Sequence, residues 1–342
     1  MTQSFGQLAD GRDTTLYTLQ NNGGMTVSIS DYGGIIKSIW MPDREGRPSD
    51  ITLGHDTADK YEADEAFMGC LIGRNANRIA DGRFVLDGVE YRMAINNPPN
   101  NLHGGPGGFH AKIWKVDEVT SNQLVLSVDS PDGEEGFPGN VAVQVVYTLT
   151  DQNELQIEYV GRTDQPTVLN MTNHAYFNLA GAGRIDDHLI SINADKITPV
   201  DDVSIPLGTF LLVDDTPFDL RQPSRIGNGL EDDHEQIILG CGYDHNFILN
   251  KQKGELAHAA TVIENTTGRQ LDVFTTEPGI QLYTGNFLKG QVGKGGMAYH
   301  KHHGFCLETQ RFPDSVNQPH FPTAFLRPGE TYKQTTIYQF SW

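Results

Sequence analysis

Cysteine is scarce in this chain. Cys70, Cys241 and Cys306 are the only three in 342 residues, and none forms a Cys-x-x-Cys pair. A disulfide framework needs denser pairs of cysteines, so we expect reduced thiols and a cytoplasmic protein. The N-terminal residues contain no basic region followed by an apolar core, which is the pattern of a secretory signal.

Positive charge is also in short supply. The chain has 25 Lys and Arg against 44 Asp and Glu, a formal net charge of −19. Such a surface repels phosphate backbones and anionic headgroups, so we expect no nucleic-acid partner and no membrane partner. No uninterrupted apolar run reaches the length that a membrane span requires. A neutral small molecule meets no such repulsion, whereas a polyanionic substrate would need a local pocket of Arg or Lys.

Helical signals are few, and alternating patterns take their place. Only Thr57–Phe67 suggests a short helix, with Asp56 or Thr57 as its N-cap. Apolar and polar residues alternate through Val141–Thr150 and again from Leu155 to Tyr159, as in half-buried strands. There is no βαβ rhythm, internal repeat or linker. The sequence predicts an all-β fold, a large antiparallel β-sandwich with few short helices, and residues 1–342 as a single domain.

One hairpin can be assigned to individual residues. Arg83–Leu86 and Val89–Met93 flank the dipeptide Asp87-Gly88, which is typical of a two-residue β-turn. This turn fixes the register and predicts that Leu86 pairs with Val89 and Phe84 with Tyr91.

Several clusters of polar and aromatic residues lie between the predicted strands. Together they contain the amides, carboxylates, imidazoles and aromatic rings that proteins use to hold a sugar. The clusters are Gly73–Ile79, Asn96–Gly105, Thr172–Gly181, Gly242–Phe247, Glu277–Asn286 and Gly304–Gln310. Loops on a rigid sheet are common places for binding groups.

The order of these motifs resembles the aldose 1-epimerase (galactose mutarotase) family. The resemblance runs from about Gly73 to Pro322 and rests on Asn-Arg-Ile, Asn-Asn-Leu-His-Gly-Gly, Thr-Asn-His-x-Tyr-Phe-Asn-Leu, Tyr-Asp-His-Asn-Phe, Pro-Gly-x-Gln-x-Tyr-Thr-Gly-Asn and Phe-Cys-Leu-Glu-Thr-Gln. It implies a large antiparallel β-sandwich that interconverts the α and β anomers of a free aldohexose such as glucose or galactose. It implies no metal and no cofactor. We expect a monomer or a homodimer.

The resemblance also implies roles for individual residues. Glu308 would be the catalytic base and His174 the catalytic acid. Five further residues would hold sugar hydroxyls and help to polarise the ring oxygen: Asn77, Arg78, His103, Asp244 and Gln281. To these we add Phe177 and Tyr283 as candidates for packing against the sugar ring. A base that removes the anomeric proton and an acid that protonates the ring oxygen are sufficient to open a cyclic hemiacetal.

Plainer interpretations stand beside these roles. An isolated glutamate such as Glu308 is most often exposed, and His174 alone is as consistent with a buried structural histidine. Arg78 could pair with a structural carboxylate, and Asn77 could cap a turn. His300, His302 and His303 have no second ligand set at zinc spacing, so we interpret them as an ordinary loop.

Three other functions remain open from the sequence. A hexose-6-phosphate 1-epimerase would need a basic pocket, for which Arg74 and Arg78 are the available residues near the motifs. A non-catalytic sugar-binding module of the same fold could dispense with the acid and the base. A glycosidase or lyase is the third, and a glycosidase normally needs two opposed carboxylates.

Overall fold

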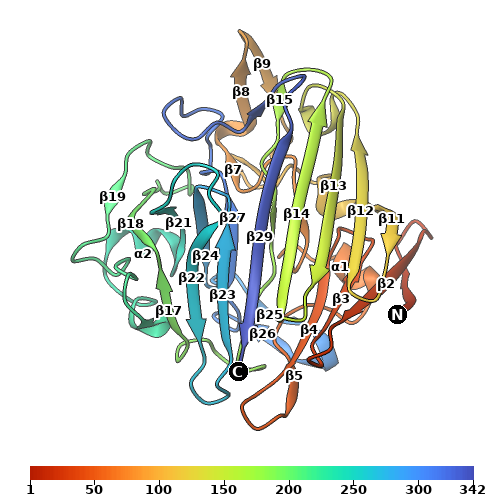
Figure 1. The fold of residues 1–342 in the computed structure, drawn as a ribbon. Coiled ribbons are helices and arrows are strands. Elements are labelled where there is room, and N and C mark those ends of the chain that lie inside the picture. The colour runs from red at the N-terminus through yellow and green to blue at the C-terminus, as the bar shows by residue number, and fades with distance from the viewer.

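Three antiparallel sheets build the molecule (Figure 1). The structure, a computed structural model, describes all residues from 1 to 342. A nine-stranded sheet packs against two five-stranded sheets, and the largest apolar cluster joins residues of all three. The predicted all-β antiparallel sandwich with few short helices is therefore confirmed. The two α-helices have five and six residues, so neither could span a membrane.

The strands are described here by sheet. The nine-stranded sheet runs in the order β11 (Lys115–Val119), β12 (Gln123–Ser130), β13 (Val141–Leu149), β14 (Glu154–Thr163), β29 (Tyr332–Ser341), β23 (Gln270–Thr275), β22 (Ala257–Ile263), β17 (Leu189–Ile192) and β20 (Ser224–Arg225). One five-stranded sheet contains β1 (Thr2–Gln7), β2 (Asp13–Gln20), β3 (Thr26–Ser30), β4 (Ile36–Pro42) and β5 (Pro48–Asp50). The other runs in the order β19 (Leu211–Leu212), β18 (Ala194–Ile197), β21 (Asp244–Leu249), β24 (Gly279–Tyr283) and β27 (Cys306–Gln310).

Short two-stranded pairs complete the fold. They are β6 (Leu71–Ile72) with β16 (Thr172–Asn173), β7 (Arg78–Ile79) with β10 (Asn101–Leu102), β8 (Arg83–Leu86) with β9 (Val89–Arg92), β15 (Thr167–Val168) with β28 (Phe325–Leu326), and β25 (Lys289–Val292) with β26 (Ala298–His300). The two α-helices are α1 (Ala58–Glu62) and α2 (Glu235–Gly240).

The alternation of apolar and polar residues in the sequence correctly predicts strands β13 and β14. Along β13 every second residue from Val141 to Leu149 is buried, while Ala142 and Gln144 are exposed. The hairpin of β8 and β9 has the predicted register, with Leu86 opposite Val89 and Phe84 opposite Tyr91. Both results follow from the two-residue period of a pleated strand.

The predicted helix over Thr57–Phe67 is only partly right. Thr57 is the N-cap residue, but its side chain makes no capping hydrogen bond, and the helix ends at Glu62. The segment that follows leaves the helix, and Phe67 adopts a left-handed backbone with φ of 57°. Residues 63–67 line a cavity instead of continuing the helix.

Strands β24 and β27 connect the core to that cavity. Even-numbered residues of β27 face the polar groups described below, whereas the odd-numbered Leu307 and Thr309 contact the nine-stranded sheet. The Tyr338 hydroxyl donates to the Leu307 carbonyl at 3.1 Å, and the Gln334 amide donates to the Thr309 carbonyl at 3.1 Å. These bonds between layers hold β27 in a fixed position under the cavity.

Candidate active site

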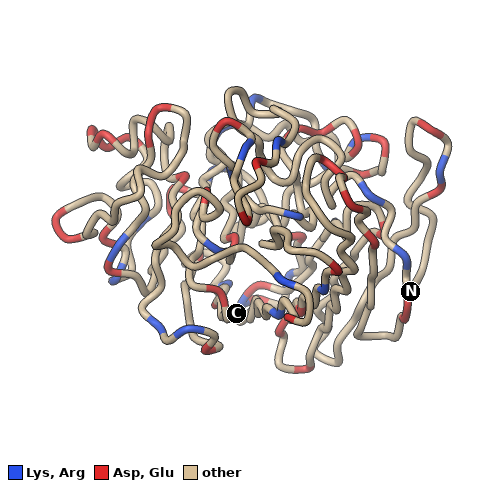
Figure 2. The backbone as a smooth tube through the Cα atoms, turned by 90° about the horizontal axis from the view of Figure 1, so that it is seen from above, with Lys and Arg blue, Asp and Glu red and all other residues tan.

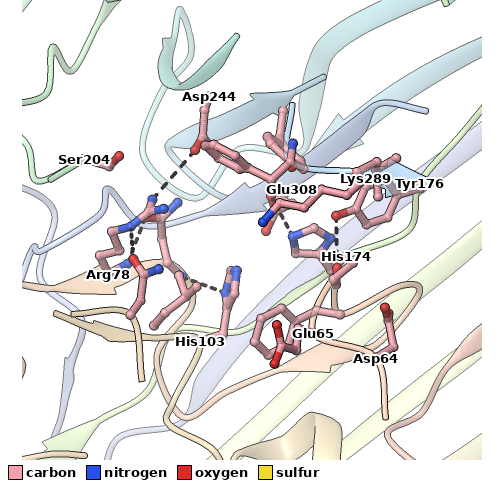
Figure 3. Close-up of a pocket in the computed structure, with 18 of the residues that line it drawn as sticks. Asp64, Glu65, Arg78, His103, His174, Tyr176, Ser204, Asp244, Lys289 and Glu308 are labelled. Atoms are coloured by element: carbon pink, nitrogen blue, oxygen red, sulfur yellow. Dashed lines mark hydrogen bonds and ion pairs between the residues drawn. The ribbon is translucent and has the colours of Figure 1, made fainter. Parts of the chain in front are cut away.

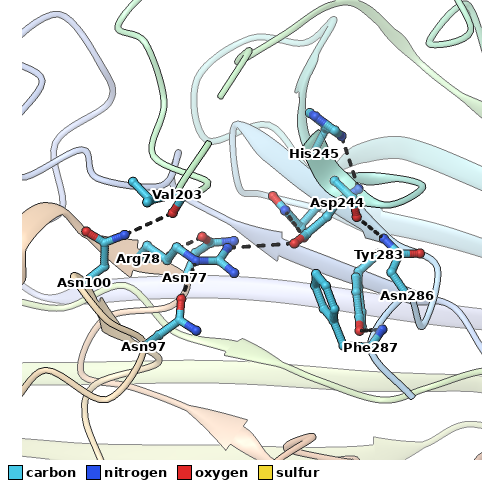
Figure 4. A network of polar contacts seen from close by, with 12 residues as sticks. Asn77, Arg78, Asn97, Asn100, Val203, Asp244, His245, Tyr283, Asn286 and Phe287 are labelled. Atoms are coloured by element: carbon cyan, nitrogen blue, oxygen red, sulfur yellow. Dashed lines mark hydrogen bonds and ion pairs between the residues drawn. The ribbon is translucent and has the colours of Figure 1, made fainter. Parts of the chain in front are cut away.

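A cavity of about 700 Å³ opens above β21, β24 and β27. Its walls also include the turn after α1, the Asn96–Gly105 loop and residues 202–204. The Asn100 side chain donates to the Val203 carbonyl at 3.0 Å, which ties this last segment to the cavity mouth (Figure 4). The volume lies within the range usual for small-molecule sites.

The structure brings the predicted site residues together. Glu308, His174, Asn77, Arg78, His103 and Asp244 all line the cavity. Gln281 does not line it, but its side-chain amide donates to Oδ1 of Asp244 at 2.7 Å. The pairing of β24 with β27 places Gln281 directly opposite Glu308. Residues separated by more than two hundred positions in the sequence therefore share one polar site.

His174 and Glu308 face each other in this cavity (Figure 3). Nε2 of His174 lies 3.6 Å from Oε1 of Glu308, and the two residues are only 5% and 2% exposed. Oε2 of Glu308 has no hydrogen-bond partner. Burial lowers the pKa of His174 to about 4. Burial, together with the negative charge of Asp244, raises the pKa of Glu308 well above its usual value.

These opposite shifts determine how many protons the pair holds. Removing a proton from the pair ionises a buried glutamic acid, and adding one charges a buried imidazole; both are unfavourable. The pair therefore keeps one exchangeable proton over a wide pH range, shared between a carboxyl and an imidazole. One proton donor and one proton acceptor side by side are the requirement for coupled acid–base chemistry.

The hydrogen bonds of His103 define which of its nitrogens carries the proton. The backbone N–H of Asn77 donates to Nδ1 of His103 at 3.2 Å. In the neutral ring the hydrogen must then be on Nε2, which becomes a donor. Burial and the neighbouring His174 and Arg78 lower the pKa of His103 well below its usual value, which favours this neutral form. His103 thus offers a fixed N–H donor.

The same observation bears on metal binding. Ligand atoms of His103, His174 and Glu308 lie within 4.8 Å of one another, and no other group of this kind occurs in the structure. A metal ion would need a lone pair on the outward nitrogen of His103, but that nitrogen carries the hydrogen. In this tautomer only His174 and Glu308 offer a lone pair to a metal ion. His302 is also engaged elsewhere, since its Nδ1 contacts the Thr284 carbonyl at 2.8 Å.

Asp244 is held by two partners. Besides the amide of Gln281, Nη1 of Arg78 lies 3.8 Å from Oδ2 of Asp244 (Figure 4). Arg78 in turn donates from Nε to Oδ1 of Asn97 at 3.0 Å. The plainer interpretation of Arg78, a carboxylate pair, is therefore present, but this pair lies in the cavity wall. It fixes a carboxylate and a guanidinium where a ligand's hydroxyls would meet both.

Asn77 and His103 share an unusual backbone. Asn77 has φ of 61° and His103 has φ of 53°, both in the left-handed region. Non-glycine residues in this region carry local strain, which persists where the surrounding structure holds them. Here the pairing of β7 with β10 and the bond from Asn77 to His103 do so. The two side chains are thereby presented to the cavity in fixed directions.

Aromatic residues line part of the cavity, but only one of our two candidates is among them. Tyr283 lines the cavity. Phe177 does not: it is fully buried and packs against Phe305 and Tyr338 in the core. The expectation that Phe177 packs against a sugar is wrong. Its neighbour Tyr176 lines the cavity instead, because adjacent residues of an extended chain point in opposite directions.

Sequence reasoning also missed several other residues of the site. Phe67, Asn97, Ser204 and Lys289 line the cavity although no role was assigned to them. Asn97 lies inside a polar cluster that the sequence did mark, but nothing in the sequence distinguishes it from its neighbours. Cys306 lies behind the site, and its Sγ is 3.5 Å from Nδ1 of His174.

The charge of the cavity distinguishes an epimerase of free aldoses from a hexose-6-phosphate 1-epimerase. Arg74 is buried away from the cavity, where it donates to Ser130 and to the carbonyls of Ser130, Pro131 and Pro138. Arg78 and Lys289 are the only Lys or Arg in the cavity wall, against the acidic residues Asp64, Glu65, Asp202, Asp244 and Glu308. Figure 2 shows acidic segments distributed over the loops of the whole molecule. The cavity therefore favours a neutral ligand over a phosphorylated one.

Known proteins are similar to this chain in sequence and in fold. The family model for aldose 1-epimerase matches residues 15–339. The chain belongs to the aldose 1-epimerase family. It is 48% identical to the galactose mutarotase of Bos taurus over 340 residues, which cover 98% of this chain and 97% of that one. It is 39% identical to the aldose 1-epimerase of Escherichia coli (strain K12), covering 97% and 96% of the two chains.

Solved structures agree with the family assignment. An aldose epimerase homologue from C. elegans superposes with a TM-score of 0.90 at 33% identity, covering 95% of this chain and 98% of that one. A galactose 1-epimerase from Lactobacillus acidophilus NCFM has a TM-score of 0.87 at 29% identity. The β-sandwich and its connections are thus those of the aldose 1-epimerase family.

Proposed function

We propose that this protein is an aldose 1-epimerase that interconverts the α and β anomers of free aldohexoses such as glucose and galactose. The observation that carries the proposal is the buried pair of His174 and Glu308, 3.6 Å apart, facing a polar cavity in a chain of this family. The anomeric hydroxyl and the ring oxygen of a pyranose are bonded to the same carbon. An acid and a base this close can each reach one of these oxygens.

The proposed reaction uses the single proton that the pair shares. In the reactive form the shared proton lies on His174 and Glu308 is ionised. Glu308 then removes the proton of the anomeric hydroxyl while His174 gives its proton to the ring oxygen, so the ring bond breaks and an aldehyde forms. Rotation about the bond between the first two carbons presents the other face of the aldehyde. The same two transfers in reverse close the ring, and the pair returns to its starting state.

The remaining polar residues position the sugar in this proposal. Nε2–H of His103 is aimed to donate to a sugar oxygen. Asp244 accepts from sugar hydroxyls while Arg78 and Gln281 hold its carboxylate in place. Asn77 offers a side-chain amide, although its Oδ1 already accepts from the N–H of Arg78 at 2.8 Å. Tyr283 and Tyr176 supply aromatic surface for the apolar side of the ring.

The other candidate functions fit the site less well. A hexose 6-phosphate would enter a cavity with more acidic than basic groups. A non-catalytic module has no need of a buried acid and base at contact distance. A glycosidase needs a second carboxylate free to act opposite Glu308; Asp244, whose charge acts on Glu308, is already engaged by Gln281 and Arg78.

We also propose the setting in which the enzyme works. Cys70, Cys241 and Cys306 are free thiols, which supports a cytoplasmic location. The net charge of −19 supports activity without nucleic-acid or membrane partners. The apolar cluster shared by all three sheets supports one domain over residues 1–342, acting as a monomer or a homodimer.

Polarimetry with freshly dissolved anomers tests the proposed function. The purified protein should accelerate the change in optical rotation of α-glucose and α-galactose, with much weaker acceleration for glucose 6-phosphate. Faster reaction of the phosphate ester would support the hexose-6-phosphate alternative. No acceleration with any free aldose, despite saturable sugar binding, would identify a binding module instead.

A further inference from the structure

A second cavity, of about 810 Å³, lies at the opposite end of the strands that carry the sugar site. It is lined by residues that follow β21, precede β24, follow β27 and begin β29 (Figure 1). None of its lining residues belongs to the first cavity. Nothing in the proposed sugar chemistry uses it.

The charge of this second cavity is opposite to that of the whole molecule. Its wall contains Lys251, Lys253, Arg311 and Lys333, and Glu277 is the only acidic residue among them. In a chain with a net charge of −19, this leaves a local excess of positive charge. Clustered cations in a concave site attract small anions even where the overall field is negative.

Most of these cations have no acidic partner. Lys251, Lys253 and Lys333 take part in no ion pair. Lys251 donates only to the backbone carbonyl of Glu277, at 3.1 Å. Glu255, the nearest acid in the same turn, accepts instead from the N–H of Gln252 at 3.0 Å. The positive charges therefore remain available to a ligand.

Arg311 is held in place for contact with an anion. Its Nε donates to the buried Glu277 carboxylate at 3.3 Å, and its Nη1 donates to the Thr323 carbonyl. Nη2 makes no protein hydrogen bond. A guanidinium that is fixed on one side and free on the other is well suited to a phosphate oxygen.

Aromatic residues line the cavity next to the cations. Phe312 and Phe321 meet edge to face with ring centroids 5.3 Å apart, and His320 packs on Phe321 at 4.7 Å. The cavity is larger than a lone phosphate needs, so there is room for an organic portion against these rings. We propose that this cavity is a second binding site, separate from the sugar pocket, for a small metabolite that carries a phosphate group.

Calorimetric titration of the full chain tests the proposal. Inorganic phosphate, glucose 6-phosphate and ADP are titrated separately, with galactose in excess to fill the sugar pocket and chloride at equal ionic strength as the blank. We compare the wild-type protein with Lys251→Gln/Lys333→Gln, and with Lys60→Gln/Lys301→Gln as a control that removes two exposed lysines elsewhere. Circular dichroism verifies the fold of each variant.

We expect saturable binding of at least one phosphate compound, weakened about tenfold or more by Lys251→Gln/Lys333→Gln, which corresponds to about 1.4 kcal/mol. The control should change the affinity less than about twofold, since exposed distant charges are screened. Mutarotation by both variants should equal that of the wild type. Equal affinity for inorganic phosphate and the esters identifies free phosphate as the ligand, whereas binding of the esters alone identifies an organic phosphate.

A second variant tests the geometry of the site. Arg311→Lys keeps a positive charge beside Glu277 but loses the planar fork, so it should weaken phosphate binding several-fold. The proposal is overturned if none of the three compounds gives heat beyond the chloride blank. It is equally overturned if Lys251→Gln/Lys333→Gln and the control lose affinity to the same extent.

Discussion

Strands β13 and β14 contrast with strands β24 and β27. In the first pair, buried and mainly apolar residues alternate with residues that are exposed or half-buried, most of them polar. In the second pair every residue is buried, and the buried set includes Gln281, Glu308 and Gln310. The first pair illustrates how a sheet is stabilised, and the second how a sheet holds polar chemistry away from water. Stability and activity should therefore depend on different strands.

The largest expected effect is on activity, at Glu308 in β27 and at His174, which directly follows β16. Glu308→Gln and His174→Asn should each lower the rate of mutarotation by about 10²–10⁴-fold, because each removes one proton-transferring group. Polarimetry measures the rates. The melting temperature should remain near that of the wild type, since neither change removes apolar packing. Near-normal activity of either folded variant would contradict the role assigned to it.

The next effect is on stability, in β14. Ile157 is fully buried, and Ile157→Ala should lower the free energy of unfolding by about 2–5 kcal/mol. The neighbouring Glu158 is exposed, so Glu158→Ala should change it by no more than about 0.5 kcal/mol. Urea denaturation gives both values. If well-folded Ile157→Ala lost catalytic rate, this would contradict the inference that stability depends on β13 and β14 and activity on β24 and β27.

A smaller effect is expected at Asp244. Asp244→Asn removes the charge that Arg78 and Gln281 hold in place, so sugar binding should weaken and KM should rise by about tenfold. The value of kcat should fall less, since the acid and the base remain. Steady-state polarimetry over a range of galactose concentrations separates the two constants. A loss confined to kcat would assign Asp244 to the chemical step.

The pH dependence of kcat/KM gives the smallest but most specific signal. Burial lowers the pKa of His174 to about 4. The acid limb of the profile should therefore lie near pH 4 and not near the pKa of a free imidazole. The basic limb reports the raised pKa of Glu308, to which Asp244 contributes. Asp244→Asn removes that repulsion and should move the basic limb to lower pH. An acid limb near pH 6.5 would contradict the buried environment of His174.

The sequence predicts much of the sheet and less of the site. The alternation along Val141–Thr150 and the Asp87-Gly88 turn depend on local rules, and both are confirmed. By contrast, the site residues come from segments far apart, and no spacing in the sequence shows that they converge. Only the family resemblance indicated that His174 and Glu308 act together.

The errors have local causes as well. Tyr176 and Phe177 are adjacent aromatic residues in an extended segment, and the sequence does not show which of them faces the cavity. Phe67 ends a segment with helical composition, but the sequence does not reveal its left-handed backbone. In the structure its ring lies beside His103, with the two ring centroids 4.8 Å apart. Tertiary packing decided both cases.

The central claim is that Glu308 and His174 share one proton and act as a unit. The double variant Glu308→Gln/His174→Asn, measured by polarimetry beside the two single variants, tests this claim most directly. Groups that work as a unit are not additive, so the double variant should be about as slow as the slower single variant. Losses that multiply in the double variant would show two independent contributions and would contradict the shared-proton mechanism.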